Sequence, residues 1–202
     1  MIKKVDILGI QLDNYTVREA IMCVERYLSN NVLNTIESIS LQMLIDSETN
    51  PVLKEVMSSL DLAIIGEKEI IQAAGLESMQ RIRETEENDF YFEFFKRIER
   101  NKKSVFLLGD TQEKIDSLKA ELTEDYPKLI FAGEYAVETC VGDLEAVIND
   151  MNATTPDVII SVLPSPMQEQ FLYEHRDKMN ANIWYGIGGY RYIRKSTEYL
   201  LV

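Results

Sequence analysis

From residue 104 onward, short apolar runs alternate with helical segments, and this order constrains the fold more than any other feature. The runs SVFLLG (104–109), VIISVL (158–163) and NIWYGI (182–187) are rich in β-branched and aromatic residues and are typical of strands. An order in which strand and helix alternate through short loops is typical of a mainly parallel sheet covered by helices. We therefore expect an α/β, Rossmann-like fold with helices on both faces of the sheet.

The first hundred residues add elements of the same kinds. Residues 5–12 carry Ile and Val around Gly9 and predict a strand or one arm of a hairpin. Thr16 can cap the helix that follows, because Glu19 stands three residues later and completes a capping box. The apolar run LDLAII (60–65) predicts a strand that is buried on both faces.

One polar stretch, ESMQRIRETEEND (77–89), has no glycine or proline to fix a turn. We interpret it as a mobile loop or a weak helical edge. The chain has 202 residues, of which 46% are hydrophobic and 27% charged, as in an ordinary globular protein. This length suits one domain, so we expect a single domain over residues 1–202.

The net charge of −13 limits the class of partner. An acidic protein repels the phosphate backbone of nucleic acids, and the densest basic stretch, residues 97–103, suits the C-terminal dipole of a helix. We therefore expect no nucleic-acid partner. Cys23 and Cys140 show no metal-binding spacing, and no apolar run approaches the roughly twenty residues that span a bilayer. These features favour a cytoplasmic protein without a metal site.

Candidate site residues follow the predicted strands. Ligands of open parallel sheets bind beyond the carboxyl ends of the strands, where backbone donors and helix N-termini converge. The loops after residues 65, 108, 133, 163 and 187 would form this edge. None of them has the phosphate-binding patterns GxxxxGK[ST] or GxGxxG. Gly109–Asp110 can be a phosphate cradle, although such a pair more often marks a tight turn from strand to helix.

The segment VLPSPMQEQF (162–171) is more informative. Its two prolines keep the chain extended until a helix begins, which places Gln168 and Glu169 in the first turn. A glutamate there is favourable for the helix dipole alone, but the pair could also bind the edge of a base or sugar hydroxyls. The single histidine, His175, is interpreted as a surface residue or the partner of a carboxylate, because no Ser, Cys or Asp constellation accompanies it.

Six segments together have a specific order and spacing. They are LGIQLDNYTVREA (8–20), NPVLKEVMSSLDLAII (50–65), NDFYFEFFKRIERNKKSVFLLGD (88–110), YPKLIFAGEY (126–135), PDVIISVLPSPMQEQF (156–171) and YGIGGYRYI (185–193). In this order they resemble the WecG/TagA/CpsF family of glycosyltransferases, whose patterns include LGxx(V/L)DxxTxxEA, VFLLGG, PDxxxVxLxxPxQExW and GVGG. The resemblance extends over nearly the whole chain.

This resemblance implies an α/β nucleotide-sugar transferase that needs neither a metal-binding DxD motif nor a cofactor. The reaction would move an N-acetylated hexosamine, typically N-acetylmannosamine, from UDP to a lipid-pyrophosphate-linked acceptor, with inversion at the anomeric carbon. The products in the family are teichoic acid linkage units, enterobacterial common antigen or capsule. Such a transfer requires a carboxylate as general base and donors that stabilise the departing UDP.

The resemblance also implies site residues, some of which depart from the family pattern. The family has Asp-Gly after the strand at 62–65, and that Asp would be the base; here the aligned pair is Gly66–Glu67, so Glu67 becomes the catalytic candidate. Ser40 aligns with the Asn of a Thr-Pro-Asn signature, and Arg191 follows the double glycine where the family has Phe-Asp. The full set of substrate-binding candidates is Ser40, Gly109, Asp110, Gln168, Glu169, Gly188, Gly189 and Arg191.

Two functional interpretations remain at this point. In the first, the protein is a working UDP-sugar transferase that acts on a lipid-linked acceptor, with Glu67 as base. In the second, it is a degenerate relative that binds a nucleotide sugar or a partner protein without turnover. The family's basic C-terminal membrane-binding appendage is not found before Val202. We therefore expect a cytoplasmic location, with peripheral contact to the inner face of the plasma membrane as an alternative. A homo-oligomer or a protein partner is also considered, and a partner is one source of the missing anchor.

Overall fold

An eight-stranded sheet forms the centre of the protein in a computed structural model that describes residues 3–76, 78–140 and 144–188. The strand order is β1-β2-β4-β3-β8-β7-β5-β6. The strands are β1 (Lys4–Ile7), β2 (Ile10–Asp13), β3 (Asn34–Ile39), β4 (Leu62–Ile65), β5 (Ser104–Gly109), β6 (Ile130–Ala136), β7 (Val158–Ser161) and β8 (Ile183–Gly186). The β1–β2 hairpin is antiparallel and the other described pairs are parallel, which confirms the predicted sheet.

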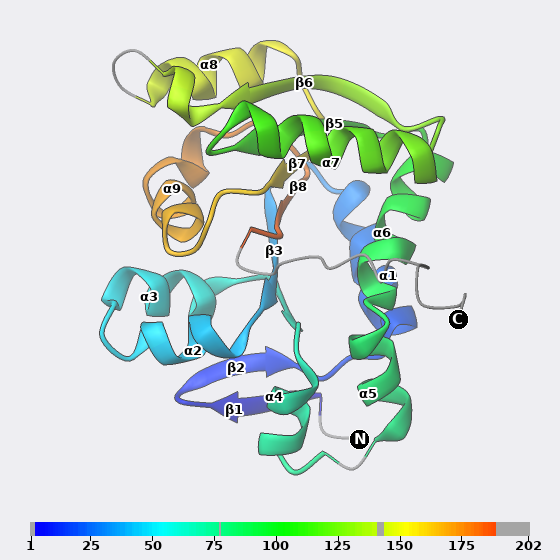
Figure 1. Cartoon of the computed structure of the whole chain (residues 1–202), viewed down its shortest axis with the longest axis vertical. Coiled ribbons are helices and arrows are strands. Elements are labelled where there is room, and N and C mark those ends of the chain that lie inside the picture. The colour runs from blue at the N-terminus through cyan, green and yellow to red at the C-terminus, as the bar shows by residue number, and fades with distance from the viewer. Residues whose placement is uncertain (1–2, 77, 141–143, 189–202) are drawn as a thin grey trace, which may run out of the picture.

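Helices cover both faces of this sheet, as predicted (Figure 1). The helices are α1 (Val17–Leu28), α2 (Leu41–Ser47), α3 (Pro51–Ser59), α4 (Lys68–Ala73), α5 (Met79–Glu86), α6 (Asp89–Arg100), α7 (Gln112–Asp125), α8 (Glu145–Ala153) and α9 (Met167–His175), with 3₁₀ turns η1 (Val137–Thr139) and η2 (Arg176–Lys178). One apolar cluster joins the sheet to α1, α6 and α7. The other joins its opposite face to α2, α3, α8 and α9.

The central strands are buried on both faces because each face carries its own helical layer. On β5, Val105 and Leu107 pack into the cluster with α1 and α6, whereas Phe106 and Leu108 pack into the cluster with α8 and α9. This arrangement explains why the strands are nearly continuous apolar runs in the sequence instead of alternating with polar residues. The capping box at the start of α1 is also confirmed, since the Glu19 amide donates to Thr16 Oγ1 and the Thr16 amide donates to Glu19 Oε2.

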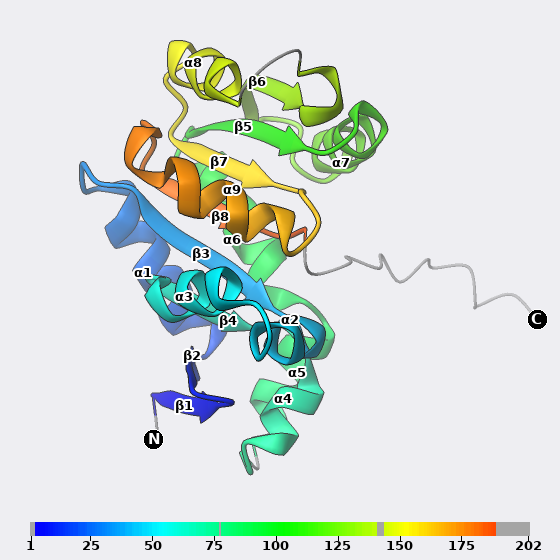
Figure 2. The same ribbon diagram turned by 90° about the vertical axis from the view of Figure 1, so that its left-hand side faces the viewer.

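The parallel strands end at one edge of the sheet, and Figure 1 is seen from that edge. Figure 2 shows the same strands from the side, with their arrowheads pointing to the right. From β3 the chain leaves through α2 and α3 to β4, whereas it reaches β8 from β7 through α9. The neighbouring strands β3 and β8 therefore mark the point where the connection from β3 leads to one side of the sheet and the connection to β8 comes from the other side. Such a point is where open α/β sheets bind their ligands.

Strand β6 extends further than the sequence predicts. The sequence analysis places a loop directly after Gly133, but β6 continues to Ala136. The extension pairs with β5, where Leu107 and Leu108 are the register partners of Glu134 and Tyr135. Because β6 lies at the edge of the sheet, its outer side tolerates polar residues that a central strand would exclude.

The polar stretch 77–89 contains helix α5, so its interpretation as a loop is wrong and the helical alternative is confirmed for Met79–Glu86. The Arg81 guanidinium donates to Glu84 Oε2 at 2.9 Å, and both side chains are buried. The same Glu84 oxygen accepts a hydrogen bond of 3.2 Å from the amide of Val17, the first residue of α1. Charged groups thus anchor this helix, and an apolar pattern cannot reveal such contacts.

This anchor yields a prediction about stability. Glu84→Ala leaves the Arg81 charge buried without its partner, so we expect the free energy of unfolding to fall by roughly 3 kcal/mol. Arg83→Ala is the matched control, because Arg83 is 69% exposed and lies 4.0 Å from Glu87. The control should change the free energy by less than about 0.5 kcal/mol in urea titrations. Equal effects of the two substitutions would show that the buried pair does not anchor α5.

Candidate active site

The carboxyl edge brings Ser40 and Glu67 together. Ser40 follows β3 and caps α2, and its Oγ accepts the Met43 amide at 3.2 Å. Glu67 follows β4, and its Oε2 accepts the amide of Leu41, the first residue of α2, at 3.0 Å. Glu67 is half-buried, so the carboxylate is held in place but stays in contact with the surface. The side chain thus lies at the carboxyl edge of the sheet, and its catalytic role stays a prediction.

Gln168 and Glu169 face inward from the first turn of α9, and both are buried. Gln168 Oε1 accepts the Gly188 amide at 3.1 Å, and Gln168 Nε2 donates to Glu169 Oε1 at 3.2 Å. The Ser165 hydroxyl donates to the other Glu169 oxygen at 2.9 Å. In this structure the pair therefore joins α9 to the segment after β8, and its contact with a ligand stays a prediction.

Two glycines permit this contact between α9 and β8. A Cβ atom at Gly186 would overlap the Gln168 amide and would lie 2.9 Å from Glu37 Cγ. A Cβ atom at Gly188 would overlap the Leu163 carbonyl group. The backbone after β8 therefore packs directly against the β7–α9 segment, which leaves no room for a side chain at either position.

At the next loop, Gly109 and Asp110 form a tight turn into α7. A Cβ atom at Gly109 would lie 2.8 Å from Ile115 Cγ1 and 3.0 Å from Val162 Cγ2. Asp110 Oδ2 pairs with Lys114 Nζ at 2.6 Å. These contacts agree with the tight turn that the sequence favoured, and a phosphate-binding role for the pair stays a prediction.

Glu138, which the sequence did not single out, lies at the same helix start. Its Oε1 accepts the amide of Gln112, the first residue of α7, at 2.7 Å. Helix N-termini attract anions, and here a carboxylate of the protein takes that place. No local pattern marks Glu138, because the contact depends on the extension of β6 past Gly133.

Of the remaining predicted residues, Gly189 and Arg191 lie outside the described residues. The prediction for His175 as a surface residue is wrong. Its side chain is buried, with its ring 4.9 Å from that of Phe171. The alternative, a carboxylate partner, fits better, because His175 Nε2 lies 3.7 Å from Glu174 Oε2.

Glu37 on β3 is the other residue that the sequence analysis missed. It is fully buried, and in the described structure neither carboxylate oxygen makes a hydrogen bond of normal geometry, although the Trp184 indole and the Gln168 amide lie close enough to oppose the rise of its pKa. Burial, and then the charge of Glu169, raise the pKa of Glu37 well above its usual value. Burial also raises the pKa of Glu169, against the hydrogen bond from Ser165. An acidic residue within the β-rich run 34–40 was the available signal, because a central strand has no solvent-facing side.

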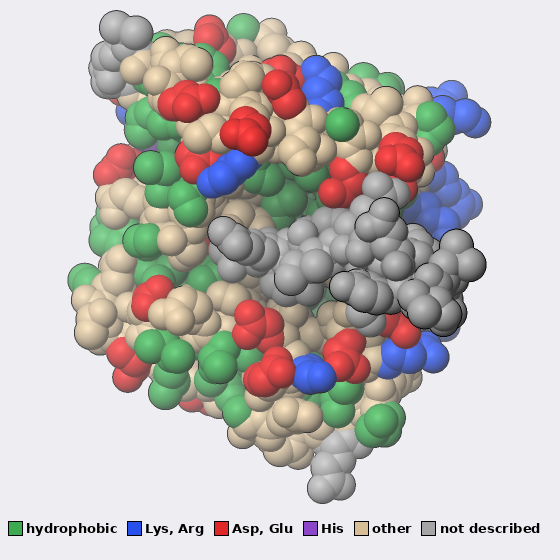
Figure 3. Space-filling model, viewed as in Figure 1, with side chains coloured by type: hydrophobic (Ala, Val, Ile, Leu, Met, Phe, Trp, Pro, Cys, Tyr) green, Lys and Arg blue, Asp and Glu red, His purple; other side chains and the backbone are tan. Residues whose placement is uncertain are grey.

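The surface around the edge is acidic. Figure 3 shows Asp and Glu side chains gathered on both sides of the centre of this face. The carboxylates at the edge include Glu67, Asp110, Glu134 and Glu138. Asp110 pairs with Lys114, and Glu134 pairs with Lys119. The negative charge of this face does not attract an anionic ligand at long range, so the affinity for such a ligand must come from direct contacts.

A separate apolar cavity of about 420 Å³ lies on the other side of α9. Its lining includes Leu144, Leu163, Met167 and Phe171. Across 3–76, 78–140 and 144–188, no group of three or more His, Cys, Asp or Glu residues could hold a metal ion. Among the helices of that same part of the chain, none is long and apolar enough to cross a membrane.

The contact between Gly186 and Gln168 predicts a non-additive pair of substitutions. Gly186→Ala should lower the free energy of unfolding by about 1–3 kcal/mol, because the added methyl overlaps the pinned Gln168 amide. Gln168→Ala opens that space, so the double variant should be more stable than the sum of the single effects by about 1 kcal/mol.

Gly75 supplies the control for this cycle: its φ of +66° makes alanine costly there, but no atom lies within 4 Å of a Cβ, so this cost does not involve Gln168. Gly75→Ala and Gln168→Ala should add to within about 0.5 kcal/mol in the same denaturation experiments. Additive effects of Gly186→Ala and Gln168→Ala would contradict the packing described here.

Comparison with known proteins agrees with the fold and the sequence patterns. The family model described as "Glycosyl transferase WecG/TagA/CpsF family" matches residues 5–191. The chain is 22% identical over 188 residues to N-acetylglucosaminyldiphosphoundecaprenol N-acetyl-beta-D-mannosaminyltransferase of Staphylococcus aureus strain NCTC 8325 / PS 47, covering 92% of this chain and 73% of the relative. The protein of the same name from strain MRSA252 gives the same identity and coverage. Because the family match takes in the carboxyl edge and almost every described element, this chain belongs to the WecG/TagA/CpsF family of glycosyltransferases.

Proposed function

We propose that this protein transfers an N-acetylhexosamine, N-acetylmannosamine or a close analogue, from a UDP-sugar to an acceptor on a lipid pyrophosphate. The product would serve the synthesis of a cell-envelope polysaccharide such as teichoic acid or capsule. The family and the names of the relatives support this reaction. The observation that carries it in the structure is the position of Glu67, a carboxylate held by the Leu41 amide at the edge where β4 and β3 end.

The donor would lie over the ends of β3 and β8. In this proposal its phosphates bind near the backbone of the Gly188–Gly189 pair, and Arg191 is a further candidate for binding the donor. Gln168 and Glu169 support this site from α9, because Gln168 holds the Gly188 backbone against that helix. Direct contacts of this kind are needed, since the acidic face supplies no general attraction for a nucleotide diphosphate.

Glu67 would act as the general base of the transfer. The acceptor hydroxyl oxygen attacks the anomeric carbon of the sugar while the bond from that carbon to the UDP oxygen breaks. Glu67 takes the hydroxyl proton, and UDP leaves with the electron pair of the broken bond. Attack opposite the leaving group inverts the anomeric centre. A lipid-linked acceptor would bring the protein to a membrane surface, which is the peripheral location that we propose.

The test is a transfer assay with UDP-N-acetylmannosamine and a soluble analogue of a lipid-linked acceptor. We expect turnover by the parent and a loss of about 10²- to 10⁴-fold in kcat for Glu67→Gln, because the amide cannot take a proton. Glu69→Gln is the matched control, since Glu69 is an exposed carboxylate two residues away on α4, and it should keep the parental rate.

Two results would contradict the proposal. If Glu67→Gln turns over as fast as the parent, Glu67 is not the base. If the folded parent binds UDP but transfers no sugar to any lipid-linked acceptor analogue, the protein is a nucleotide-sugar binder and not a transferase.

A further inference from the structure

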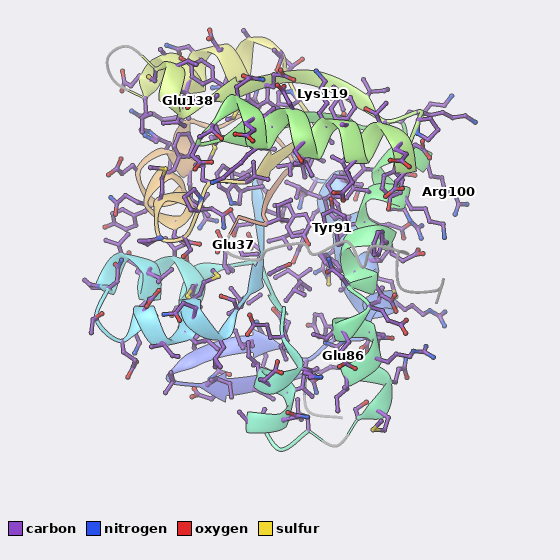
Figure 4. The ribbon with its side chains drawn as sticks, in the orientation of Figure 1. Glu37, Glu86, Tyr91, Arg100, Lys119 and Glu138 are labelled. Carbon is purple, nitrogen blue, oxygen red and sulfur yellow. The ribbon has the colours of Figure 1, made fainter. Side chains whose placement is uncertain are left out.

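Glu37 occupies an unusual place for a carboxylate. It lies on the central strand β3 (Figure 4). It has no exposed surface, and its register partner on β8 is Gly186. On the face covered by α9, its side chain converges with that of Gln168 on the space above Gly186. The indole nitrogen of Trp184, on β8, is likewise buried without a hydrogen-bond partner among the described residues.

Among the described residues, no positively charged group compensates Glu37. The charge of Glu169 on α9 acts on it, and its other polar neighbours, Gln168 and Trp184, are uncharged. His175 lies further along α9 and packs on Phe171, whose ring stacks on Trp184. In the described chain neither Glu37 nor Glu169 has an ion-pair partner. Two ionised carboxylates in a dry layer repel each other and lose hydration, so such a pair retains a proton.

We propose that Glu37 is a positioning residue of the nucleotide-sugar site. The two carboxylates Glu37 and Glu169 together retain one proton, and Glu37 packs against the Gln168 side chain over Gly186, so that the Gln168 oxygen accepts the Gly188 N–H. Glu37 and Gln168 converge over Gly186, Gln168 Nε2 donates to Glu169 Oε1, and Gln168 Oε1 accepts the Gly188 amide. The role of Gly188 in binding UDP rests on the proposed function, whereas the proton retained by Glu37 and Glu169 and the hydrogen bonds of Gln168 do not depend on it.

The sign of the pH dependence follows from the folded state holding this proton more tightly than the unfolded chain. The pKa of Glu37 is raised in the folded state from its ordinary value of 4.5. Above that ordinary value the unfolded chain has lost the proton that the folded protein keeps. The contribution of Glu37 to stability is therefore fully present below the ordinary value, and it is lost as the pH rises through the folded pKa.

Glu37→Gln tests the shared proton, because the amide has nearly the same shape and cannot ionise. Between about pH 5 and about pH 9, the melting temperature of the parent should fall relative to that of Glu37→Gln by about 3 °C or more. Glu55→Gln is the matched control, since Glu55 is an exposed carboxylate on α3, and its profile should stay parallel to that of the parent. Parallel profiles for the parent and Glu37→Gln would overturn the proposal.

Amide hydrogen exchange tests the positioning role. As the pH rises over the same interval, protection of the Gly188 amide should fall about tenfold in the parent and stay constant in Glu37→Gln. The Gly66 amide, which donates to the Ile39 carbonyl at 2.9 Å, is the internal control and should not change. If the melting profiles differ as expected but Gly188 protection does not respond, Glu37 has a structural role alone and the positioning role is refuted.

UDP binding separates this inference from the proposed function. In calorimetry, the affinity of the parent for UDP should weaken relative to that of Glu37→Gln as Gly188 loses protection. If UDP binds neither protein while Gly188 responds to pH as described, the proposed function fails and the role of Glu37 in holding Gly188 stands.

Discussion

The hydrogen bond from the Gly188 amide to Gln168 is the contact on which the arrangement of this edge depends. It joins the last described strand to the first turn of α9, across the point where the connections of the sheet diverge. The bond requires glycine at 186 and 188, because a side chain at either position would overlap Gln168 or the Leu163 carbonyl. A buried polar link of this kind is costly unless each member is satisfied, and Glu169 and Ser165 complete it on the far side of Gln168.

The electrostatics of the edge follow from where the carboxylates lie. Glu67 and Glu138 take the first amides of α2 and α7, so the positive ends of these two helices are balanced by the protein itself. An incoming diphosphate would have to displace a carboxylate at either helix. The backbone after β8 is different, because the group that accepts the Gly188 amide is the uncharged Gln168 side chain, which does not repel a phosphate as a carboxylate does. This difference explains why we place the phosphates of the donor near Gly188.

The sequence was sufficient for those features that depend on local patterns. The alternation of apolar runs with helices predicted the parallel sheet, and Thr16 with Glu19 predicted the start of α1. The features that it did not predict depend on contacts between distant segments. Helix α5 is anchored by Glu84 to the first amide of α1, 67 residues away. The burial of Glu37 depends on α9 covering a central strand, and the position of Glu138 depends on how far β6 pairs with β5.

We propose that a nucleotide sugar binds where β3 and β8 end. A crystal structure of the full chain with UDP at saturating concentration tests this proposal. Density for UDP is expected over the ends of these two strands, with its phosphates close to the backbone at Gly188. Density in the apolar cavity beyond α9, or an edge that stays unoccupied while UDP is bound elsewhere, would contradict it.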